Sequence, residues 1–494
     1  MSIFSTVDRS EPVKPCFNIG AGFDVPTATV LTGKYGESIL NGGYTIFNGM
    51  AGKANVFKSA LLEWMELAAQ ERIYYALDII PDTLKYDTEI NKNEGHIRNF
   101  ATELPAFRNT NPIDSGNMVI TDKSKYSGNK FFEVMKESLK SKDEKDSVWI
   151  TLPFLDRDNK TLYRCKMPTF GGVDSLTEFD TDAEREMSDG NELGESGANT
   201  LFMKSGLFKT RFLMELSPII HSKLHYMGMV AQIGNEVSIQ TGPMPAAPKK
   251  SLNGMKNGEV MKSVTSKFSF LSSILYQPIS AKALYNGSRM EDGPLYPMEK
   301  SDKDFKSKND NDLFEIQLKC LRNKHGPSEF LMTVILSQSL GVQRELTEFH
   351  FIKERRFGLE GNLQNYNIVL LPEVKLSRTT VRRKLDDNYK LRRAVNILAE
   401  ILQFRDLKPI ALARGDINCS PEELYNDLKA QGYDWNVLLE TRGWYCPNND
   451  DPKLIPFLSS IDLLRMRKGL YFPFWMDPET KKRKPEYDNY KPYE

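Results

Sequence analysis

The chain has 494 residues, and its 66 basic side chains balance its 66 acidic ones, so its formal net charge is zero. Hydrophobic residues make up 40% and charged residues 27%, which is typical of a globular protein and excludes a mostly disordered chain. No stretch approaches the ~18 consecutive apolar residues of a membrane-spanning helix, and the first residues lack the apolar core of a signal peptide.

The first third of the chain carries a strand, loop, helix and strand in succession. A β-rich run over 44–48 precedes a loop of small residues, and apolar residues recur at helical spacing over 59–70. The apolar run 73–77 predicts a second strand. This order is the βαβ unit of an α/β fold with a largely parallel sheet.

The remaining elements extend this pattern and then change character near residue 356. We expect an exposed helix near 131–139, a long helical stretch over 201–227 that breaks near Pro218, and strands over 148–155, 169–173, 229–233 and 268–276. The runs 314–321 and 330–336 predict a hairpin. Helices are predicted at 388–404 and 421–431. The sequence therefore divides into an N-terminal segment (1–27), which is a candidate contact to a neighbouring protomer, an α/β core (28–355) and a smaller, mainly helical C-terminal domain (356–494).

A candidate phosphate-binding loop lies between the first predicted strand and helix. It consists of Gly52, Lys53, Ala54, Asn55, Val56, Phe57, Lys58 and Ser59. Backbone N–H groups at a helix N-terminus attract an anion, Lys58 would neutralise phosphate charge, and the Ser59 hydroxyl would bind Mg²⁺. A second glycine usually stands where this chain has Phe57. The alternative interpretation is a lysine at an ordinary helix start.

This form of the loop resembles that of the phage UvsX strand-exchange proteins, which belong to the RecA superfamily. Three later segments resemble the same family in the same order. The strand over 169–173 ends at Asp174, which would support the metal; the strand over 229–233 contains Gln232, which would sense the γ-phosphate; and Lys267 would reach the ATP of a neighbouring subunit. The resemblance covers roughly residues 28–355 and implies a RecA-like P-loop ATPase core.

One departure from the family pattern bears on catalysis. The predicted strand 74–78 would correspond to the RecA strand that ends in Asp-x-Glu, whose glutamate activates the attacking water. In that register the glutamate position holds Ile80, which cannot accept a proton. Asp78 or Asp82 is the candidate substitute for this catalytic role. Hydrolysis is therefore a weaker expectation than ATP binding.

Three segments are candidates for DNA binding. The loop 234–266 is rich in glycine and proline and carries a net charge of about +2; its candidate DNA contacts are Lys249, Lys250, Lys256 and Lys262. The segment 177–196 stands where RecA proteins carry their first DNA-binding loop, but it is strongly acidic, and a solvated linker is an equal alternative. The basic stretch 375–393 predicts either a guide for duplex DNA or a helix face whose arginines pair with acids elsewhere.

The resemblance implies an ATP- and Mg²⁺-dependent recombinase that forms a helical filament on single-stranded DNA and pairs it with homologous duplex. Its partners would include single-strand-binding and mediator proteins, with no membrane. Two alternatives remain: a DnaB-type hexameric helicase on the same core, and an ATP-stabilised filament scaffold that does not hydrolyse ATP. The five scattered cysteines form no CxxC pair and fit a reducing compartment, so we expect a cytoplasmic location, inside the infected bacterium if the protein is phage-encoded.

Overall fold

A computed structural model gives the fold of this chain. It describes residues 15–20, 22–24, 29–142, 148–156, 160–189, 195–235, 250–287, 292–298, 312–362, 365–406, 417–440, 443–446 and 458–488. No helix within these ranges is long and apolar enough to cross a membrane.

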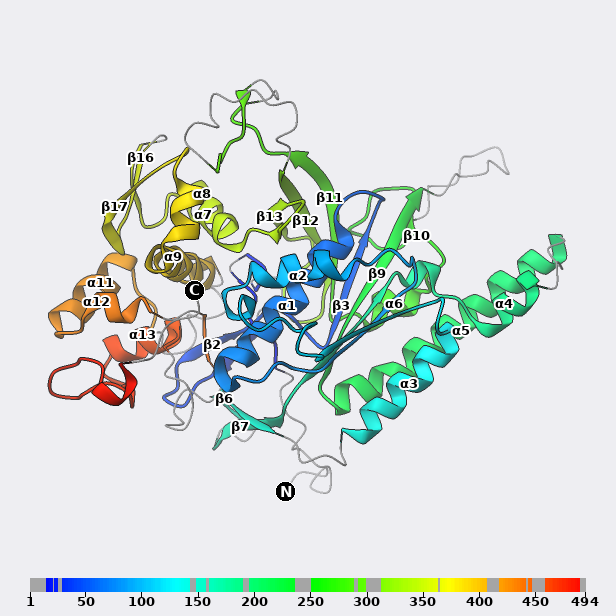
Figure 1. Ribbon diagram of the computed structural model, residues 1–494, viewed down its shortest axis with the longest axis horizontal. Helices are drawn as coiled ribbons and strands as arrows, with labels where there is room; N and C mark the ends of the chain where they lie inside the picture. Colours follow the sequence, from blue (N-terminus) through cyan, green and yellow to red (C-terminus); the bar gives the residue numbers. More distant parts are fainter. Residues whose placement is uncertain are drawn as a thin grey trace.

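The centre of the molecule is a ten-stranded, mostly parallel sheet (Figure 1). Its order is β14 (Gly341–Val342), β13 (Leu331–Ser337), β12 (Leu313–Asn323), β11 (Ile274–Ala283), β3 (Phe47–Gly52), β9 (His225–Asn235), β8 (Thr169–Asp174), β4 (Thr83–Asp87) and β5 (Met118–Asp122), with β10 (Glu259–Met261) beside β9. The strands from β11 to β5 run parallel, so their carboxyl ends share one edge. The α/β class is therefore confirmed.

The first strand and helix follow the predicted order, with shifted boundaries. Strand β3 begins three residues after the predicted start, and α1 (Lys58–Leu77) continues through 73–77. The strand predicted over 73–77 is therefore wrong, because a five-residue apolar run fits a buried helix turn as well as a strand. The next strand is β4, which pairs with β8 and β5.

The second half of the sheet is antiparallel. The predicted hairpin is confirmed as β12 and β13. The strand predicted over 268–276 is partly wrong, because residues Ser266–Leu271 form helix α6 and β11 begins only at Ile274. Likewise the loop predicted over 234–266 contains strand β10 in its described part. Two further pairs of strands lie outside the central sheet: β1 (Thr29–Thr32) with β2 (Ser38–Asn41), and β6 (Trp149–Leu155) with β7 (Leu162–Lys166).

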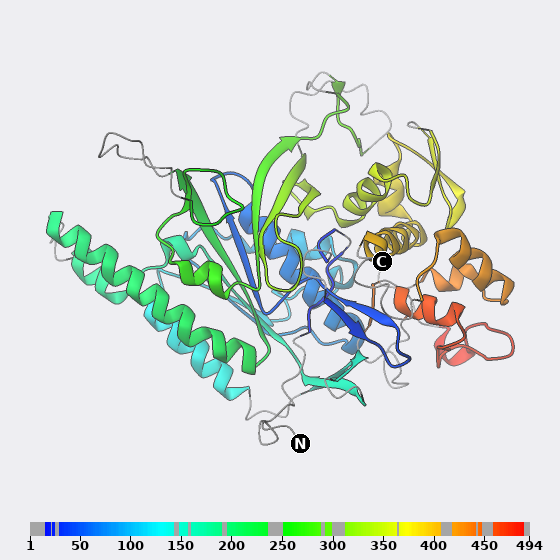
Figure 2. The ribbon, with the colours of Figure 1, turned by 180° about the vertical axis from the view of Figure 1, so that it is seen from behind.

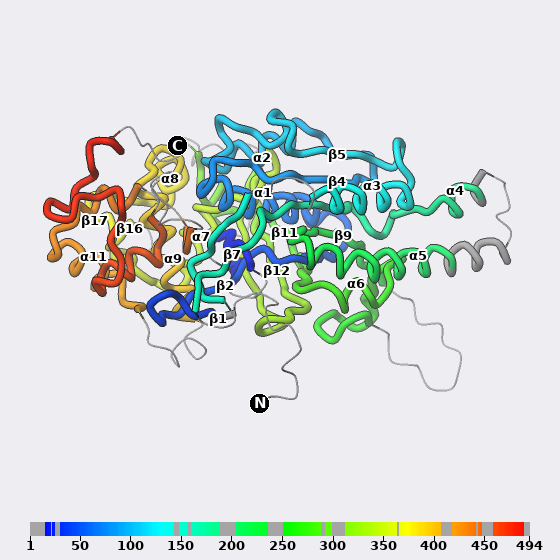
Figure 3. Tube along the Cα trace, turned by 90° about the horizontal axis from the view of Figure 1, so that it is seen from below, coloured from blue at the N-terminus to red at the C-terminus, as the bar shows by residue number. Residues whose placement is uncertain are grey.

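Helices α3 (Gly128–Ser141), α4 (Asp182–Asp189) and α5 (Glu195–Ser222) extend away from the sheet at one end of the molecule (Figures 1 and 3). Helix α3 confirms the helix predicted near 131–139. Helix α5 contains Pro218 without ending there, so the predicted break is wrong. The acidic segment after Asp174 was predicted as a loop, but most of its described part is helical, since acidic residues in the first turn of α4 favour the helix N-terminus.

The C-terminal region lies at the opposite end of the molecule from these helices (Figure 2). It follows α7 (Arg344–Glu354) and includes a small sheet together with its helices. These elements are β15 (Leu359–Gly361), β16 (Asn365–Ile368), β17 (Leu371–Ser377), α8 (Val381–Asp387), α9 (Tyr389–Asp406), α11 (Pro421–Ala430), α12 (Trp435–Leu438) and α13 (Ser460–Arg467). Both predicted helices are present. The Asn396 amide of α9 donates to Glu348 of α7, so buried contacts cross the predicted boundary.

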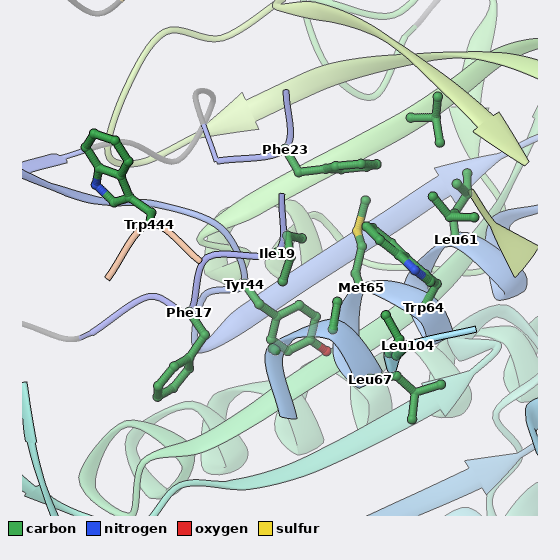
Figure 4. Close-up of a cluster of buried hydrophobic side chains, with 14 of the residues drawn as sticks. Phe17, Ile19, Phe23, Tyr44, Leu61, Trp64, Met65, Leu67, Leu104 and Trp444 are labelled. Carbon is green, nitrogen blue, oxygen red and sulfur yellow. The ribbon is translucent and has the colours of Figure 1, made fainter. Parts of the chain in front are cut away.

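The described part of the N-terminal segment packs against the core of its own chain. Figure 4 shows its apolar side chains beside helix α1, and the rings of Phe23 and Trp64 lie 5.0 Å apart. The backbone N–H of Gly22 donates to Gln403 of helix α9 at 2.6 Å. The segment therefore joins the core to the C-terminal region.

We predict that one buried histidine makes the fold acid-sensitive. His225 is 3% exposed, its Nδ1 lies 3.0 Å from the Thr169 hydroxyl, and burial, with a smaller contribution from Lys142, lowers its pKa to about 3. Unfolded histidine titrates near 6.5, so the unfolded chain binds the extra proton between pH 6.5 and about 3. Stability should thus fall by up to ~1.4 kcal/mol per pH unit from this group as pH drops through that window. Urea unfolding at pH 7 and pH 5 should show a smaller loss in His225→Phe than in the original chain; equal losses would contradict the prediction.

Candidate functional site

A pocket of about 730 Å³ opens at the edge of the sheet where the parallel strands end. A volume of this size suits a small-molecule ligand. Its wall includes most of the predicted phosphate loop, from Ala54 to Ser59, together with Asp174 and Gln232. Gly52 at the end of β3 is in register with Gln232 of β9, and Asp174 of β8 is in register with Asp87 of β4. The fold thus brings distant segments of the sequence to one place.

The predicted phosphate loop joins strand β3 to the first turn of α1. Lys58 is half-buried, and its ammonium donates to the backbone carbonyl of Lys53 at 2.6 Å across the loop. Burial lowers the pKa of Lys58, while Asp174 and Glu89 act in the opposite direction. The helix N-terminus and this cation together create positive potential at the pocket wall.

Phe57 occupies the position where the usual loop pattern has glycine. Its φ is 59°, in the left-handed region that glycine adopts without strain. The Phe57 ring packs on Phe314 of β12, with centroids 5.2 Å apart. This packing holds a backbone conformation that a bulky residue rarely adopts.

Ser59 and Asp174 lie together at the base of the pocket. Burial raises the pKa of the Asp174 carboxyl, an effect that Lys92 and the nearby Ser59 hydroxyl oppose. Asp174 Oδ1 is buried and has no hydrogen-bond partner among the described residues. A hydroxyl and an unpartnered carboxylate oxygen are ligands that suit Mg²⁺. These residues therefore fit the metal that was predicted for them.

The predicted substitutes for the water-activating glutamate do not lie at this pocket. Asp78 caps the C-terminus of α1, about 30 Å from Lys58 along a 20-residue helix. The Asp82 carboxylate accepts from Asn117 just before β4, at the amino end of that strand. Both assignments are corrected, because they depended on the strand predicted over 73–77.

The structure instead brings Glu89 to the pocket. Glu89 follows β4 in the run Asp87-Thr88-Glu89, which is an Asp-x-Glu pattern in the register that the sequence analysis missed. Its Oε1 accepts from the Ser175 hydroxyl at 3.3 Å, and its backbone N–H donates to Asp87. The peptide bond between Asp174 and Ser175 is cis. The Asp-x-Glu pattern was present in the sequence, but the strand predicted from the preceding apolar run put the expected glutamate at position 80, nine residues before Glu89.

A buried network of charges lies beneath the loop. Glu63 and Glu66 of α1 face Lys85 of β4, and Lys92 lies beside Glu63 at 3.0 Å and Asp174 at 3.7 Å. Burial alone would raise the pKa of Glu63, but Lys85 and Lys92 hold it below its usual range. Of these network residues, only Asp174 was predicted from the sequence. The sequence signal for this network was the presence of Glu63 and Glu66 on the buried side of helix α1, where charged residues need a partner.

Gln232 connects the pocket to two neighbouring segments. Its backbone N–H donates to the Thr177 hydroxyl at 2.9 Å, and its backbone carbonyl accepts from the backbone N–H of Lys262 at 2.9 Å. Lys53 of the phosphate loop forms an ion pair with Glu259 of β10 at 3.3 Å. The pocket therefore contacts the segments that precede α4 and follow β9.

The predicted DNA-contacting lysines are only partly described. Lys250, Lys256 and Lys262 are exposed, whereas Lys249 lies outside the described residues. Lys267 does not line the pocket; in α6 its ammonium lies 5.5 Å from the centre of the exposed Phe270 ring. Two further cations lie near the same ring, at 5.6 and 5.9 Å: Arg322 and Lys324. No local motif marks this cluster, because Lys267 and Phe270 belong to α6 whereas Arg322 and Lys324 lie at the end of β12 and just after it.

The basic stretch 375–393 is partly structural. Arg382 pairs with Asp312, and Arg392 donates to the carbonyls of residues 385 and 386. Arg393 is fully buried and contacts Asn396 and Glu400. These contacts match the alternative in which the arginines serve the protein itself. No family model matches this sequence, and a search of curated proteins found no similar protein.

Proposed function

We propose that the chain is an ATP-dependent DNA strand-exchange protein of the RecA type, which assembles on single-stranded DNA. One observation carries the proposal: Lys58, Ser59, Asp174, Glu89 and Gln232 all line one pocket at the carboxyl edge of a parallel sheet. Ligands of α/β proteins bind at such edges. A lysine at a helix start beside a hydroxyl and a carboxylate suits a nucleotide triphosphate with Mg²⁺.

Each residue of the pocket has a distinct role in this proposal. Lys58 and the N-terminus of α1 hold the phosphates, and Ser59 and Asp174 hold the metal, which neutralises phosphate charge when bound. Glu89 orients a water and accepts its proton. Gln232 can donate its amide to a phosphate while its backbone contacts Thr177 and Lys262. Binding of the nucleotide would thereby change the conformation of the segments that are proposed to contact DNA.

The cluster of Lys267, Arg322 and Lys324 supports assembly. These three cations surround an exposed ring and lie away from the pocket of their own chain. In the proposed filament they would approach the phosphates of the ATP held by the neighbouring copy. The residues that bind ATP and those that sense it would then belong to different copies, which couples binding to assembly.

Electron microscopy with single-stranded DNA and a slowly hydrolysed ATP analogue tests the proposal. We expect an open helical filament that requires both ligands, together with ATP hydrolysis that single-stranded DNA stimulates. A closed ring that unwinds a forked duplex would instead assign the ring-helicase alternative. Assembly without any hydrolysis would assign the scaffold alternative. That alternative was suggested by Ile80 at the expected glutamate position, and Ile80 does not line the pocket. Absence of both ATP binding and assembly would overturn all three.

A further inference from the structure

The segment 88–93, between β4 and α2 (Glu94–Thr102), carries Glu89 and, near its end, Lys92. The carboxylate of Asp87 accepts the backbone N–H groups of Glu89, Asn91 and Lys92 at 2.9, 2.8 and 2.7 Å. Ile90 within the segment has a φ of 53°, a conformation that is unfavourable for a branched residue. The backbone of this segment is therefore held in a specific, locally strained shape.

The side chain of Lys92 leaves this segment and enters the protein. It is 13% exposed, and its ammonium lies 3.0 Å from Glu63 of α1 and 3.7 Å from Asp174 of β8. Glu63 is only 4% exposed and also pairs with the buried Lys85. Removal of an ammonium from such a place lowers the stability of the fold, because a buried carboxylate then loses its partner. The contact therefore joins the segment to the helix that begins at the phosphate loop.

We propose that Lys92 is a positioning residue, which fixes Glu89 relative to the phosphate loop by tying the segment 88–93 to α1. The inference rests on the proposed ATPase function. Lys92 and Glu63 both line the pocket, but the Lys92 ammonium already donates to Glu63 at 3.0 Å, so its effect on the reaction passes through the segment's backbone instead of a contact with the nucleotide. A displacement of about 1 Å in a catalytic group can cost ~10²-fold in rate, so loss of the tie should affect turnover far more than nucleotide binding.

The test compares Lys92→Met with a variant that keeps the charge of the buried network. The network holds three carboxylates, on Glu63, Glu66 and Asp174, and two ammonium groups, on Lys85 and Lys92. Lys92→Met alone adds one net negative charge and can destabilise the fold. The double variant Lys92→Met with Glu63→Gln restores the original net charge while leaving the tie broken. Lys130→Met is the matched control, since it removes an exposed ion pair of 3.3 Å, with Glu133, far from the pocket.

We expect the double variant to melt within a few degrees of the original chain, to lose at least tenfold in kcat for ATP hydrolysis, and to change KM by less than about threefold. Lys92→Arg should recover part of the lost kcat, and Lys130→Met should behave as the original chain. Unchanged kcat in the double variant would overturn the inference. A rise in KM that accounts for the whole loss in kcat/KM would also overturn it, because Lys92 would then bind nucleotide directly.

Hydrogen–deuterium exchange on nucleotide-free protein gives an independent measurement. The backbone N–H groups of Glu89, Asn91 and Lys92 should exchange at least tenfold faster in the double variant than in the original chain, while the Lys130→Met protein matches the original. Equal exchange in all three proteins would overturn the inference. If the original chain does not hydrolyse ATP, the proposed function fails, but this exchange measurement still decides whether Lys92 holds the segment.

Discussion

Glu89→Gln should lower kcat for ATP hydrolysis by ~10²–10⁴-fold, the usual contribution of a general base, while ATP affinity changes by less than about threefold. Glutamine has the size of glutamate and can still accept from Ser175, whose hydroxyl contacts Glu89 at 3.3 Å. It cannot take a proton from water. Steady-state hydrolysis in the presence of single-stranded DNA, with a separate titration of a fluorescent ATP analogue, measures the two effects.

The matched controls are the two aspartates that the sequence analysis assigned to this role. Asp78→Asn and Asp82→Asn should hydrolyse ATP like the original chain, because both residues lie at the opposite edge of the sheet from the pocket. Loss of hydrolysis in Asp82→Asn with normal turnover in Glu89→Gln would reject the corrected assignment. Normal hydrolysis in all three variants would reject both the assignment of Glu89 and the assignment of Asp78 or Asp82 as the general base.

Lys58→Ala should weaken ATP binding by ~10–100-fold, because charge-assisted hydrogen bonds contribute about 1.5–3 kcal/mol each. Since DNA binding is proposed to require ATP, single-stranded DNA binding should fall with it. Lys58 is half-buried at the start of α1, and its ammonium crosses the loop to the carbonyl of Lys53. Calorimetric titration with ATP and Mg²⁺, followed by a filter-binding assay with labelled DNA, measures both losses.

Lys140→Ala serves as the control for Lys58→Ala. Lys140 is an exposed lysine in the last turn of α3, so the substitution removes the same charge without touching the pocket. It should bind ATP like the original chain. If Lys58→Ala binds ATP as tightly as the control does, the loop does not hold phosphate. If it loses ATP binding but keeps full DNA binding, the proposed coupling between nucleotide and DNA is wrong.

Local sequence pattern was sufficient to place the candidate phosphate loop and its surroundings. The small-residue run between a strand and a helix with regular apolar spacing placed Lys58 and Ser59 at a helix start, as the structure has them. Asp174 at the end of β8 and the β12–β13 hairpin also followed from short patterns. These features depend on neighbouring residues, so the sequence alone carries the information.

The sequence could not place segments whose local pattern fits two structures. The apolar run 73–77 suits a strand, but it continues α1 because its residues bury against the rest of the core. Residues 266–271 likewise form α6 instead of the start of a strand. The charged network around Lys92 gave no recognisable motif, because its members come from α1, β4, β8 and the segment 88–93.

The order of motifs in the sequence was sufficient to propose a phosphate loop, an α/β core and an acid at the end of a later strand, whereas the zero net charge supported none of these. Only the tertiary structure decided which acid faces the pocket. Glu89 lies there because Thr83 pairs with Phe170 and Asp87 with Asp174, contacts between residues almost 90 positions apart. Such strand pairing depends on how the whole sheet packs, so it cannot be predicted from a local sequence pattern.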